Sequence, residues 1–396
     1  MTAYLDHAAS TPIRPEALQA YTEAALACGN SSSVHSAGRR SRRLLEESRE
    51  RLARAIGANP FEVVFTSGGT ESDNLALKGI YRGRRGADPE CRRILLSRVE
   101  HHAVLDAAEW LAEHEGAELV WLAVDAAGRV HPGEVAAALA QAPQRTALVS
   151  AMWANNEVGS ISAIADIVAV AHEAAVPVHT DAVQAVGSVP VDVNACGVDA
   201  LSLSGHKFGG PLGVGALVAR RGLPLVPLLQ GGGQEQGQRS GTVNVPGAVG
   251  LSVAAEVAVA ALEDQSVRIA ALRDLLLTGI LARVPDAVVA GAPVGEGRLP
   301  GNAHVRFPGC EGDSLLYLLD AAGVECSTGS ACQAGVPQPS HVLTAMGVPA
   351  ESAHGALRFS LGHTSTEADV RQVLAVIGDV VERARTAGLA SVGGGS

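Results

Sequence analysis

A lysine that directly follows a predicted buried strand has the setting that Schiff-base chemistry needs. Of the 30 lysines and arginines, only Lys78 and Lys207 are lysines, and Lys207 lies in the Ser-Gly-His-Lys segment 204–207 after the apolar stretch 198–203. A desolvated lysine can lose its proton and attack a carbonyl, which arginine cannot do. Lys207 is therefore a candidate nucleophile, although the glycines around it could simply form an ordinary strand-to-loop turn.

A turn of small residues, 66–72, runs into a helical pattern and is suited to bind a phosphate. Such a turn exposes backbone N–H groups at the positive end of the helix dipole. The G-K-[ST] ending of a nucleotide-binding P-loop is missing. Alternatively, Thr70 caps the helix and Asp73 completes that cap.

Polar side chains follow three further predicted strands. His101 and His102 come after strand 93–97 and could bind a metal, stack on a ring or lie at the surface, but adjacent histidines point in different directions and do not suit one shared metal. Asn155 and Asn156 come after strand 146–151.

The third of these strands, 177–180, is followed by Asp181 and Gln184. A carboxylate at a buried strand end can keep a pyridine nitrogen protonated, which turns the ring into an electron sink, or it can cap a helix. Together with the lysine, the phosphate turn, the histidine and the asparagine, it describes a pyridoxal-phosphate pocket.

A second nucleophile lies in the Gly/Pro-rich run 326–339, which has no periodicity and is expected to form a mobile loop. Cys332 in this run is expected to be reactive, and a nearby cation or histidine would help to ionise a thiol whose ordinary pKa is about 8.5. Cys326 fits a structural role better. Arg358, in the strand-like stretch 356–360, suggests a paired carboxylate, for which that of an amino-acid substrate is one choice.

The elements that must position these residues alternate between short apolar segments and helical patterns such as 39–56, which ends at Gly57. This alternation predicts an α/β fold with a mostly parallel sheet, and ligands bind beyond the carboxyl ends of its strands. From about residue 256 longer helices dominate, which predicts a second, smaller domain. The expected strands are 62–66, 93–97, 118–122, 146–151, 177–180, 198–204 and 214–219.

Composition narrows the class of protein. The formal net charge of −11 over 396 residues disfavours direct contact with nucleic acid or an anionic membrane. The chain starts without a signal-peptide pattern and has no uncharged apolar run of membrane-spanning length. Six scattered cysteines without C-x-x-C spacing favour free thiols in a reducing cytoplasm over a disulfide framework or a zinc site.

The ordered motifs resemble the cysteine desulfurases of the nitrogen-fixation and iron–sulfur-cluster type, which are pyridoxal-phosphate enzymes of the class V aminotransferase group. The resemblance runs from segment 4–9 to segment 358–362 and departs at Ser31, where the family often has proline, and at Gly69, where it often has alanine. The motifs between these ends are 29–35, 66–74, 100–105, 155–159, 204–207, 239–246 and 329–332.

The resemblance implies the fold of type I pyridoxal-phosphate-dependent transferases, an α/β fold with a mostly parallel seven-stranded sheet in a large domain and a smaller α+β domain. The large domain would span 15–255. The small domain would combine 1–14 with 256–390 and carry the catalytic cysteine loop at about 327–340, and 391–396 would form a flexible tail.

The same resemblance implies a role for each candidate residue. Lys207 would bind the cofactor and move protons at the substrate Cα, and Cys332 would take the sulfur as a persulfide. Arg358 would bind the substrate carboxylate, with Asn30 and Asn156 near the substrate. Around the cofactor ring, the implied contacts are His101 stacked on the ring, Asp181 at the ring nitrogen and Gln184 at the ring hydroxyl, with Asn156 also in the cofactor pocket. The implied phosphate contacts are Gly69, Thr70, Ser204 and His206. Thr242 would be added by the partner subunit of a homodimer.

The implied reaction converts L-cysteine to L-alanine and passes the sulfur from Cys332 to an iron–sulfur scaffold protein or a tRNA-thiolation enzyme. Selenocysteine lyase and other lyase or transaminase activities are the enzymatic alternatives, and transamination would not need the thiol. A non-catalytic sulfur carrier or assembly subunit is the other alternative, against which the intact Lys207 and Asp181 argue. No resident metal is implied, and whether Cys332 also serves as a transient iron–sulfur ligand is left open.

Overall fold

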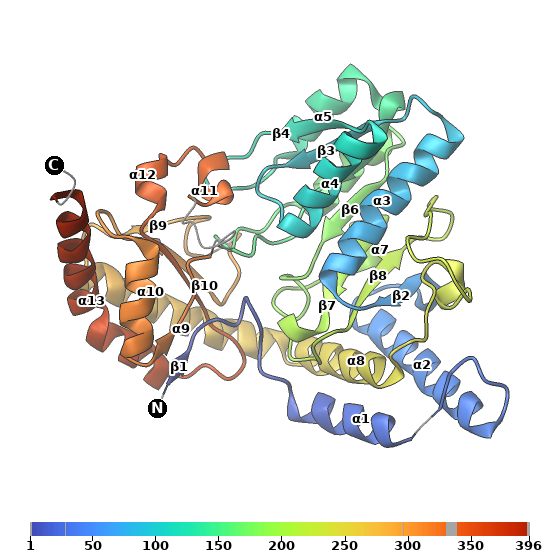
Figure 1. The fold of residues 1–396 in the computed structure, drawn as a ribbon, viewed down its shortest axis with the longest axis horizontal. Helices are drawn as coiled ribbons and strands as arrows, with labels where there is room; N and C mark the ends of the chain where they lie inside the picture. The colour runs from blue at the N-terminus through green and yellow to red at the C-terminus, as the bar shows by residue number, and fades with distance from the viewer. Residues whose placement is uncertain (1, 28, 296, 330–338, 394–396) are drawn as a thin grey trace.

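The computed structural model of the protein describes residues 2–27, 29–295, 297–329 and 339–393, with side chains up to residue 386. A large unit with a central sheet lies beside a smaller unit that holds both ends of the described chain, and α8 and α9 run between them (Figure 1). Helix α8 spans Val245–Ala260 and α9 spans Leu262–Arg283, with a bend of 73° between them. No single helix of the described chain is long and apolar enough to cross a membrane, although this bent pair together passes by length and composition alone.

The large unit is built on a seven-stranded, mostly parallel sheet, which confirms the predicted fold class. In spatial order the strands are β2 (Val63–Thr66), β8 (Gly215–Ala219), β7 (Ala200–Ser204), β6 (Val178–Asp181), β5 (Thr146–Ser150), β3 (Arg93–Ser97) and β4 (Glu118–Leu122). The five strands β7, β6, β5, β3 and β4 pair in parallel, whereas β8 is antiparallel to both of its neighbours. All seven predicted strands exist, with ends shifted by at most two residues.

Helices cover both faces of this sheet, which explains why strands such as β2 and β8 are nearly continuous apolar runs. On β3, Ile94 and Leu96 join one core cluster and Leu95 joins the other, as the two-residue repeat of a strand requires. The first cluster includes residues of α3 (Gly69–Ala87) and α4 (His102–Glu115). The helices of the second cluster are α2 (Ser36–Ala55), α5 (Pro132–Gln141), α6 (Ile164–Glu173) and α8, while α1 (Pro15–Leu26) packs on α8.

Helix α2 shows how local signals fix an element. It begins at Ser36, three residues before the predicted start, because the His35 side chain caps it by accepting a hydrogen bond from the Gly38 N–H at 3.3 Å. It ends before Gly57, whose φ of 61° and close approach to Asp192 both require glycine. The predicted C-terminal glycine is therefore correct.

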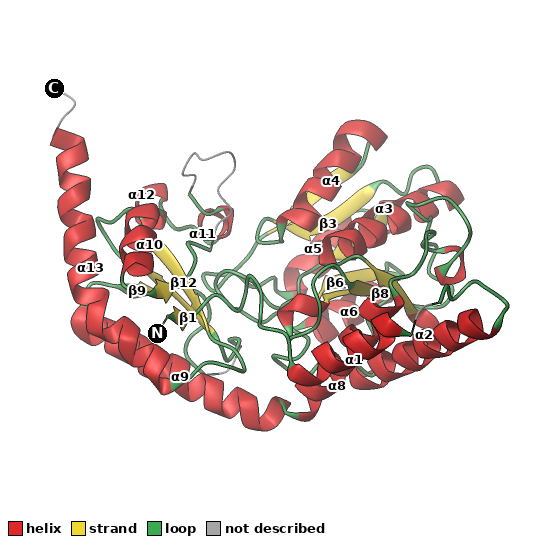
Figure 2. Cartoon of the chain, turned by 60° about the horizontal axis from the view of Figure 1, so that its bottom comes forward, coloured by secondary structure: helices red, strands yellow, loops and turns green. Residues whose placement is uncertain are grey.

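The smaller unit has a core of its own and combines the two ends of the chain. Its antiparallel sheet has the order β12 (Ala356–Ser360), β10 (Asn302–Arg306) and β9 (Val288–Val289), and β1 (Ala3–Tyr4) pairs in parallel with β11 (Val324–Glu325). Helices α9, α10 (Gly312–Ala321) and α13 (Glu367–Gly393) lie beside its sheet (Figure 2). The core cluster of this unit includes Leu5, Phe307 and Phe359. The short helices α11 (His341–Ala345) and α12 (Ala350–Ala353) precede β12. The predicted domain limits, 15–255 against 1–14 with 256–390, stay a prediction.

Candidate active site

A cavity of about 400 Å³ opens where the carboxyl ends of the central strands face β12 of the smaller unit. This is the sheet edge at which an α/β protein is expected to bind its ligand, and the volume suits a small molecule. Segments that are far apart in the sequence meet here. The predicted site residues that line it are Gly69, Thr70, His101, Asn156, Asp181, Gln184, Ser204, His206, Lys207 and Arg358.

Lys207 lies in a single 3-10 turn directly after β7, as the sequence predicted. Its Nζ donates to the carbonyl oxygens of Ala8 at 2.6 Å and Ala9 at 2.9 Å. Burial, together with the positive charge of Arg358, lowers the pKa of Lys207 from 10.5 to about 8. A lysine with this pKa supplies a useful fraction of neutral amine near neutral pH, which is what attack on a carbonyl requires.

The predicted phosphate turn ends at the N-terminus of α3, which begins at Gly69 without any hydrogen bond from a capping side chain. The capping roles considered for Thr70 and Asp73 are therefore not adopted. Ser204 lies beside this turn, because a Cβ on Gly69 would be 3.5 Å from its Cβ, and Ser204 and His206 both line the cavity. Burial, with the charge of Lys207, lowers the pKa of His206 to about 4, so this ring is neutral near neutral pH.

Gly69 has a packing reason in this chain. A Cβ at this position would lie 2.8 Å from Cγ2 of Val183, which is closer than side-chain carbons approach each other. Val183 follows Asp181 and lines the cavity as well. Alanine, frequent at this position in the resembling family, would require Val183 to shift.

Asp181 is the last residue of β6 and is only 5% exposed. Its Oδ1 accepts a hydrogen bond from the Val183 N–H at 2.8 Å. Burial, strengthened by the charge of Asp73, raises the pKa of Asp181 to about 7. A nearby cation such as a protonated ring nitrogen would favour its charged form.

Asp73 was missed as a site residue. It is 1% exposed and lines the cavity beside Asp181, and its Oδ1 lies 3.5 Å from Nε2 of His179. Burial raises the pKa of Asp73 to about 7, against which a hydrogen bond with Ser202 acts. His179 contacts the hydroxyls of Ser150 at 2.9 Å and Ser202 at 3.0 Å. One signal in the sequence could have identified Asp73. This carboxylate lies on the apolar face of α3, between Gly69 and Leu77, where it is not needed as a helix cap.

His101 caps α4: its Nδ1 accepts a hydrogen bond from the Ala103 N–H at 3.1 Å, which leaves Nε2 to carry the ring proton. Its ring borders the cavity and is exposed there, yet the surrounding protein lowers its pKa through partial burial. His102 points elsewhere, with its ring 4.8 Å from that of His341, so the two adjacent histidines diverge as expected.

The two asparagines of the 155–159 turn have different tasks. Asn155 is buried, and its Oδ1 accepts hydrogen bonds from the N–H groups of Glu157 and Val158, both at 2.9 Å. Asn156 lines the cavity, and its carbonyl oxygen accepts a hydrogen bond from Nη1 of Arg358 at 3.0 Å. Only Asn156 is therefore in contact with the site.

Arg358 projects from β12 into the wall of the cavity and is 5% exposed. The sequence suggested a paired carboxylate, and the structure provides one in Asp6, whose Oδ1 lies 2.8 Å from Nη2 of Arg358. No local pattern indicates this partner, because the two residues are separated by 352 positions.

Two predicted site residues, Asn30 and Thr242, are not among the described residues that line the cavity, and a third cannot be placed. Asn30 is exposed, and its Oδ1 accepts a hydrogen bond from the Ser32 N–H at 2.9 Å; Thr242 is exposed too. Cys332 lies outside the described residues, although Ser327 and Gly329, just before it in sequence, line the cavity. The roles assigned to these three residues stay predictions.

The described cysteines differ from the reactive thiol that the sequence predicted. Cys326 is buried, and burial, with the charge of Asp6 adding to it, raises its pKa to about 12. Burial also raises the pKa of Cys91, Cys196 and Cys310. Cys326 is therefore inert at neutral pH, in line with its expected structural role.

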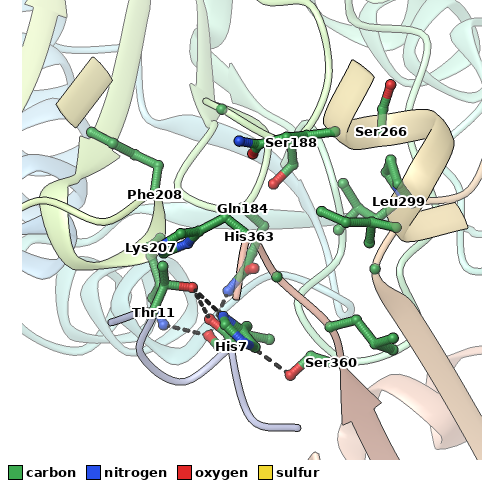
Figure 3. Close-up of a pocket in the computed structure, with 18 of the residues that line it drawn as sticks. His7, Thr11, Gln184, Ser188, Lys207, Phe208, Ser266, Leu299, Ser360 and His363 are labelled. Atoms are coloured by element: carbon green, nitrogen blue, oxygen red, sulfur yellow. Dashed lines mark hydrogen bonds between the residues drawn. The ribbon is translucent and has the colours of Figure 1, made fainter. Parts of the chain in front are cut away.

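A second cavity of about 70 Å³ shares Ala8, Gln184 and Lys207 with the first. Figure 3 shows the side chains of Lys207 and Gln184 beside His7 and Thr11 of the N-terminal segment. The amide of Gln184 donates to the carbonyl oxygen of Ala8 at 2.9 Å, the same oxygen that Lys207 contacts. Residues 7–11 thus form part of the site wall.

The residues present fit pyridoxal phosphate. The uncapped first turn of α3, Ser204 and neutral His206 offer donors to a phosphate at one end of the cavity. The buried carboxylates of Asp181 and Asp73 also line the cavity, and Oδ1 of Asp73 has no hydrogen-bond partner in the described part of the chain. A cationic ring nitrogen would compensate these carboxylates. No cluster of three or more metal-ligating side chains occurs among the described residues.

Known proteins that are similar to this chain match it over nearly its whole length. The model of the family Aminotransferase class-V matches residues 3–373. An IscS-like cysteine desulfurase of Mycobacterium tuberculosis is 57% identical over 393 residues, covering 99% of each chain. Cysteine desulfurase IscS of Methanosarcina thermophila is 46% identical and covers 96% of this chain and 92% of its own.

Solved structures have the same fold over nearly the whole chain. A NifS-like protein superposes with a TM-score of 0.87 at 35% identity, covering 97% of this chain and all of its own. A NifS-like protein from Rickettsia africae gives a TM-score of 0.85 at 30% identity, covering 96% of this chain and all of its own. The chain belongs to the class-V aminotransferase family, whose fold is that of the type I pyridoxal-phosphate enzymes. Within that family it is one of the cysteine desulfurases, and pyridoxal phosphate is its cofactor.

Proposed function

We propose that this cysteine desulfurase converts L-cysteine to L-alanine with Lys207 as the cofactor-binding base, Arg358 as the carboxylate anchor and Cys332 as the sulfur acceptor. The observation that carries the proposal is the single cavity in which Lys207, Asp181, Arg358 and the uncapped N-terminus of α3 meet. In this one pocket, Lys207 would react with the carbonyl of the cofactor and Arg358 would bind the carboxylate of the substrate.

Each part of the cavity has one task toward the cofactor. Pyridoxal phosphate, when bound, withdraws electrons from the Cα of the amino acid attached to it. The first turn of α3, Ser204 and His206 would hold its phosphate. Asp181 would keep the ring nitrogen protonated, and His101 would contact the ring. Asn156 and Gln184 complete the walls, and the lining position of each supports this assignment.

Lys207 moves the proton of the substrate. A lysine with a pKa near 8 accepts a proton at neutral pH and returns it without a large energetic penalty. Arg358 binds the substrate carboxylate and thereby sets the direction of the Cα–H bond. The lowered pKa of Lys207 and the buried setting of Arg358 both support this division of tasks.

Sulfur transfer follows as a nucleophilic displacement. The thiolate of Cys332 attacks the substrate sulfur, a new S–S bond forms, and the Cβ–S bond of the substrate breaks. The electron pair of the broken bond stays with the carbon skeleton, which takes up a proton at Cβ and leaves as L-alanine. Cys332 is left as a persulfide, and the terminal sulfur passes to an iron–sulfur scaffold protein or a tRNA-thiolation enzyme. Ser327 and Gly329 at the cavity wall, shortly before Cys332 in sequence, support this assignment.

We further propose a cytoplasmic homodimer, in which Thr242 of one subunit reaches the phosphate of the other. Thr242 is exposed and does not line the cavity of its own chain. Several large apolar side chains of the large unit are also exposed, including Leu26 at 81%, Val34 at 87% and Leu212 at 73%. A subunit interface would cover side chains of this kind. Light scattering on the purified protein tests the dimer, and Thr242→Ala is expected to weaken cofactor binding.

The proposed activity is tested by incubating purified, cofactor-loaded protein with L-cysteine and quantifying alanine and protein-bound persulfide, with Cys332→Ala in parallel. Alanine and persulfide formed in step, and both lost in the variant, are expected. Alanine or pyruvate formed equally by the variant would indicate a lyase or transaminase instead. A protein that binds no pyridoxal phosphate would indicate a sulfur carrier. L-Selenocysteine as a competing substrate distinguishes a selenocysteine lyase.

A further inference from the structure

We propose that Asp6 is a positioning residue, which holds the guanidinium of Arg358 in the orientation that receives the substrate carboxylate. The proposal rests on the proposed function of Arg358 and adds a second residue to the same subsite. Arg358 and Asp6 come from opposite ends of the chain and meet at the wall of the cavity.

Within the described part of the chain, the guanidinium of Arg358 donates one hydrogen bond from each of its Nη atoms. Nη1 donates to the Asn156 carbonyl oxygen at 3.0 Å, and Nη2 donates to Oδ1 of Asp6 at 2.8 Å. Nε is buried and has no hydrogen-bond partner in the described part of the chain. Because a guanidinium has five N–H bonds, one N–H on each Nη is left for a ligand. Two parallel N–H groups match the two oxygens of a carboxylate.

Asp6 is itself fixed by its backbone. Its carbonyl oxygen accepts hydrogen bonds from the Ala9 N–H at 3.0 Å and the Ser10 N–H at 3.2 Å, and Asp6 forms a parallel bridge with Ser360 of β12. The turn that starts at Asp6 also provides the carbonyl oxygens of Ala8 and Ala9 that Lys207 contacts. A single tight turn therefore touches both the substrate anchor and the catalytic lysine.

The Asp6 carboxylate also compensates the buried positive charge of Arg358. The Arg358 side chain is 6% exposed, and a buried cation without a counter-charge is strongly destabilising. Asp6, with 23% side-chain exposure, supplies that charge before the substrate arrives. The Asp6 carboxylate thus orients Arg358 and leaves the remaining N–H groups of the guanidinium for the substrate carboxylate.

A purely structural role and a positioning role predict different kinetics. If Asp6 acts by position, the variant Asp6→Asn keeps an acceptor oxygen and is expected to retain the KM for L-cysteine within about threefold. Asp6→Glu keeps the charge but displaces the acceptor by one methylene, and Asp6→Ala removes it. Both are expected to raise this KM by about tenfold or more, while kcat changes less than about threefold.

The experiment compares the three variants and wild type, all loaded with cofactor, for KM and kcat with L-cysteine and for the Kd of L-alanine, measured from the cofactor absorbance. Asp286→Ala is the matched control, because Asp286 forms a 2.7 Å pair with Arg385 in the same unit but away from the cavity. It is expected to leave KM and the L-alanine Kd unchanged.

The expected result is a raised KM and a raised L-alanine Kd for Asp6→Glu and Asp6→Ala, with full cofactor occupancy. An unchanged Kd in both variants, or loss of cofactor in step with loss of affinity, would overturn the positioning role. If Asp6→Ala does not fold, Asp6→Glu carries the test. If wild type binds L-alanine but forms none from L-cysteine, the proposed function fails while the L-alanine affinities still decide the role of Asp6.

Discussion

Nζ of Lys207 lies 2.6 Å from the carbonyl oxygen of Ala8, so the first turn of the chain contacts the lysine at position 207. The contact is polar but not ionic, and it therefore holds the amine in place without stabilising its charge as strongly as a carboxylate would. Burial and the positive charge of Arg358 then lower the pKa of Lys207. The lysine is oriented and kept easy to deprotonate.

The rate at which the cofactor-free protein takes up pyridoxal phosphate is expected to depend on pH through Lys207. Only the neutral amine attacks a carbonyl, and the pKa is about 8 rather than the ordinary 10.5. The uptake rate should rise ~10-fold per pH unit up to about pH 8 and level off above it. Absorbance changes after rapid mixing measure the rate, with Lys207→Ala as the control. A rate that keeps rising to about pH 10 would contradict the lowered pKa.

The variant Asp73→Asn is expected to gain stability over wild type as pH rises. The folded-state pKa of Asp73, about 7, lies above its ordinary value of 3.8. The folded state therefore binds more protons between these values, and wild type loses stability as pH rises through about 4 to 7. Removing the carboxyl removes this loss, which is on the order of 2–4 kcal/mol above about pH 7.

Urea unfolding of cofactor-free wild type and Asp73→Asn at about pH 5 and pH 8 measures this effect. Asp181 is present in both proteins, and because the charge of Asp73 helps to raise the pKa of Asp181, the difference reports Asp73 together with its effect on Asp181. A difference between variant and wild type that is equal at the two pH values would show that Asp73 carries no raised pKa.

The segment that precedes Thr242 is tied to the large unit by a buried ion pair. Arg49 and Glu235 are 4% and 1% exposed at their side chains and form two contacts, of 2.9 and 2.8 Å. The Phe65 N–H also donates to Glu235 at 2.7 Å. Glu235→Ala leaves Arg49 buried without its counter-charge and should cost about 3–5 kcal/mol in the free energy of unfolding.

Glu46→Ala is the matched control for this pair. Glu46 contacts Nε of Arg49 at 3.2 Å, but its side chain is 51% exposed. Its removal should cost less than about 1 kcal/mol. Chemical denaturation of both variants measures the two costs, and equal values would contradict the assignment of the buried pair.

Brief alkylation of the native protein at about pH 7.5 is expected to leave four cysteines unmodified. Cys91, Cys196, Cys310 and Cys326 all have a pKa raised by burial, that of Cys326 to about 12, and a thiol reacts through its thiolate. Peptide mass spectrometry should find the label first on Cys332. Labelling of Cys326 at a comparable rate would contradict its buried, protonated state.

The strands of the large sheet could be predicted closely because helices bury both of their faces. Short apolar runs such as 94–96 within strand 93–97 indicate these strands. The direction of β8 was not predicted. It follows β7 after a short turn with no helical crossover, and such a connection can only be antiparallel. Strands of two residues, such as β1 and β11, are too short for any periodicity to indicate.

The site residues at strand ends could be predicted because sheet topology gathers strand ends at one edge. Lys207 and Asp181 are of this kind, and the cavity contains both. Asp6 and Asp73 could not be predicted, because their importance lies in contacts with residues far away in sequence, Arg358 and His179. No local pattern encodes such a contact.

The most direct test of the central claim is a single turnover of cofactor-loaded protein with a limiting amount of L-cysteine, without reductant or acceptor. Mass spectrometry of the alkylated peptides should place one added sulfur on Cys332, in a one-to-one ratio with the alanine released. Alanine formed without sulfur on Cys332, or with sulfur on Cys326 instead, would contradict the account.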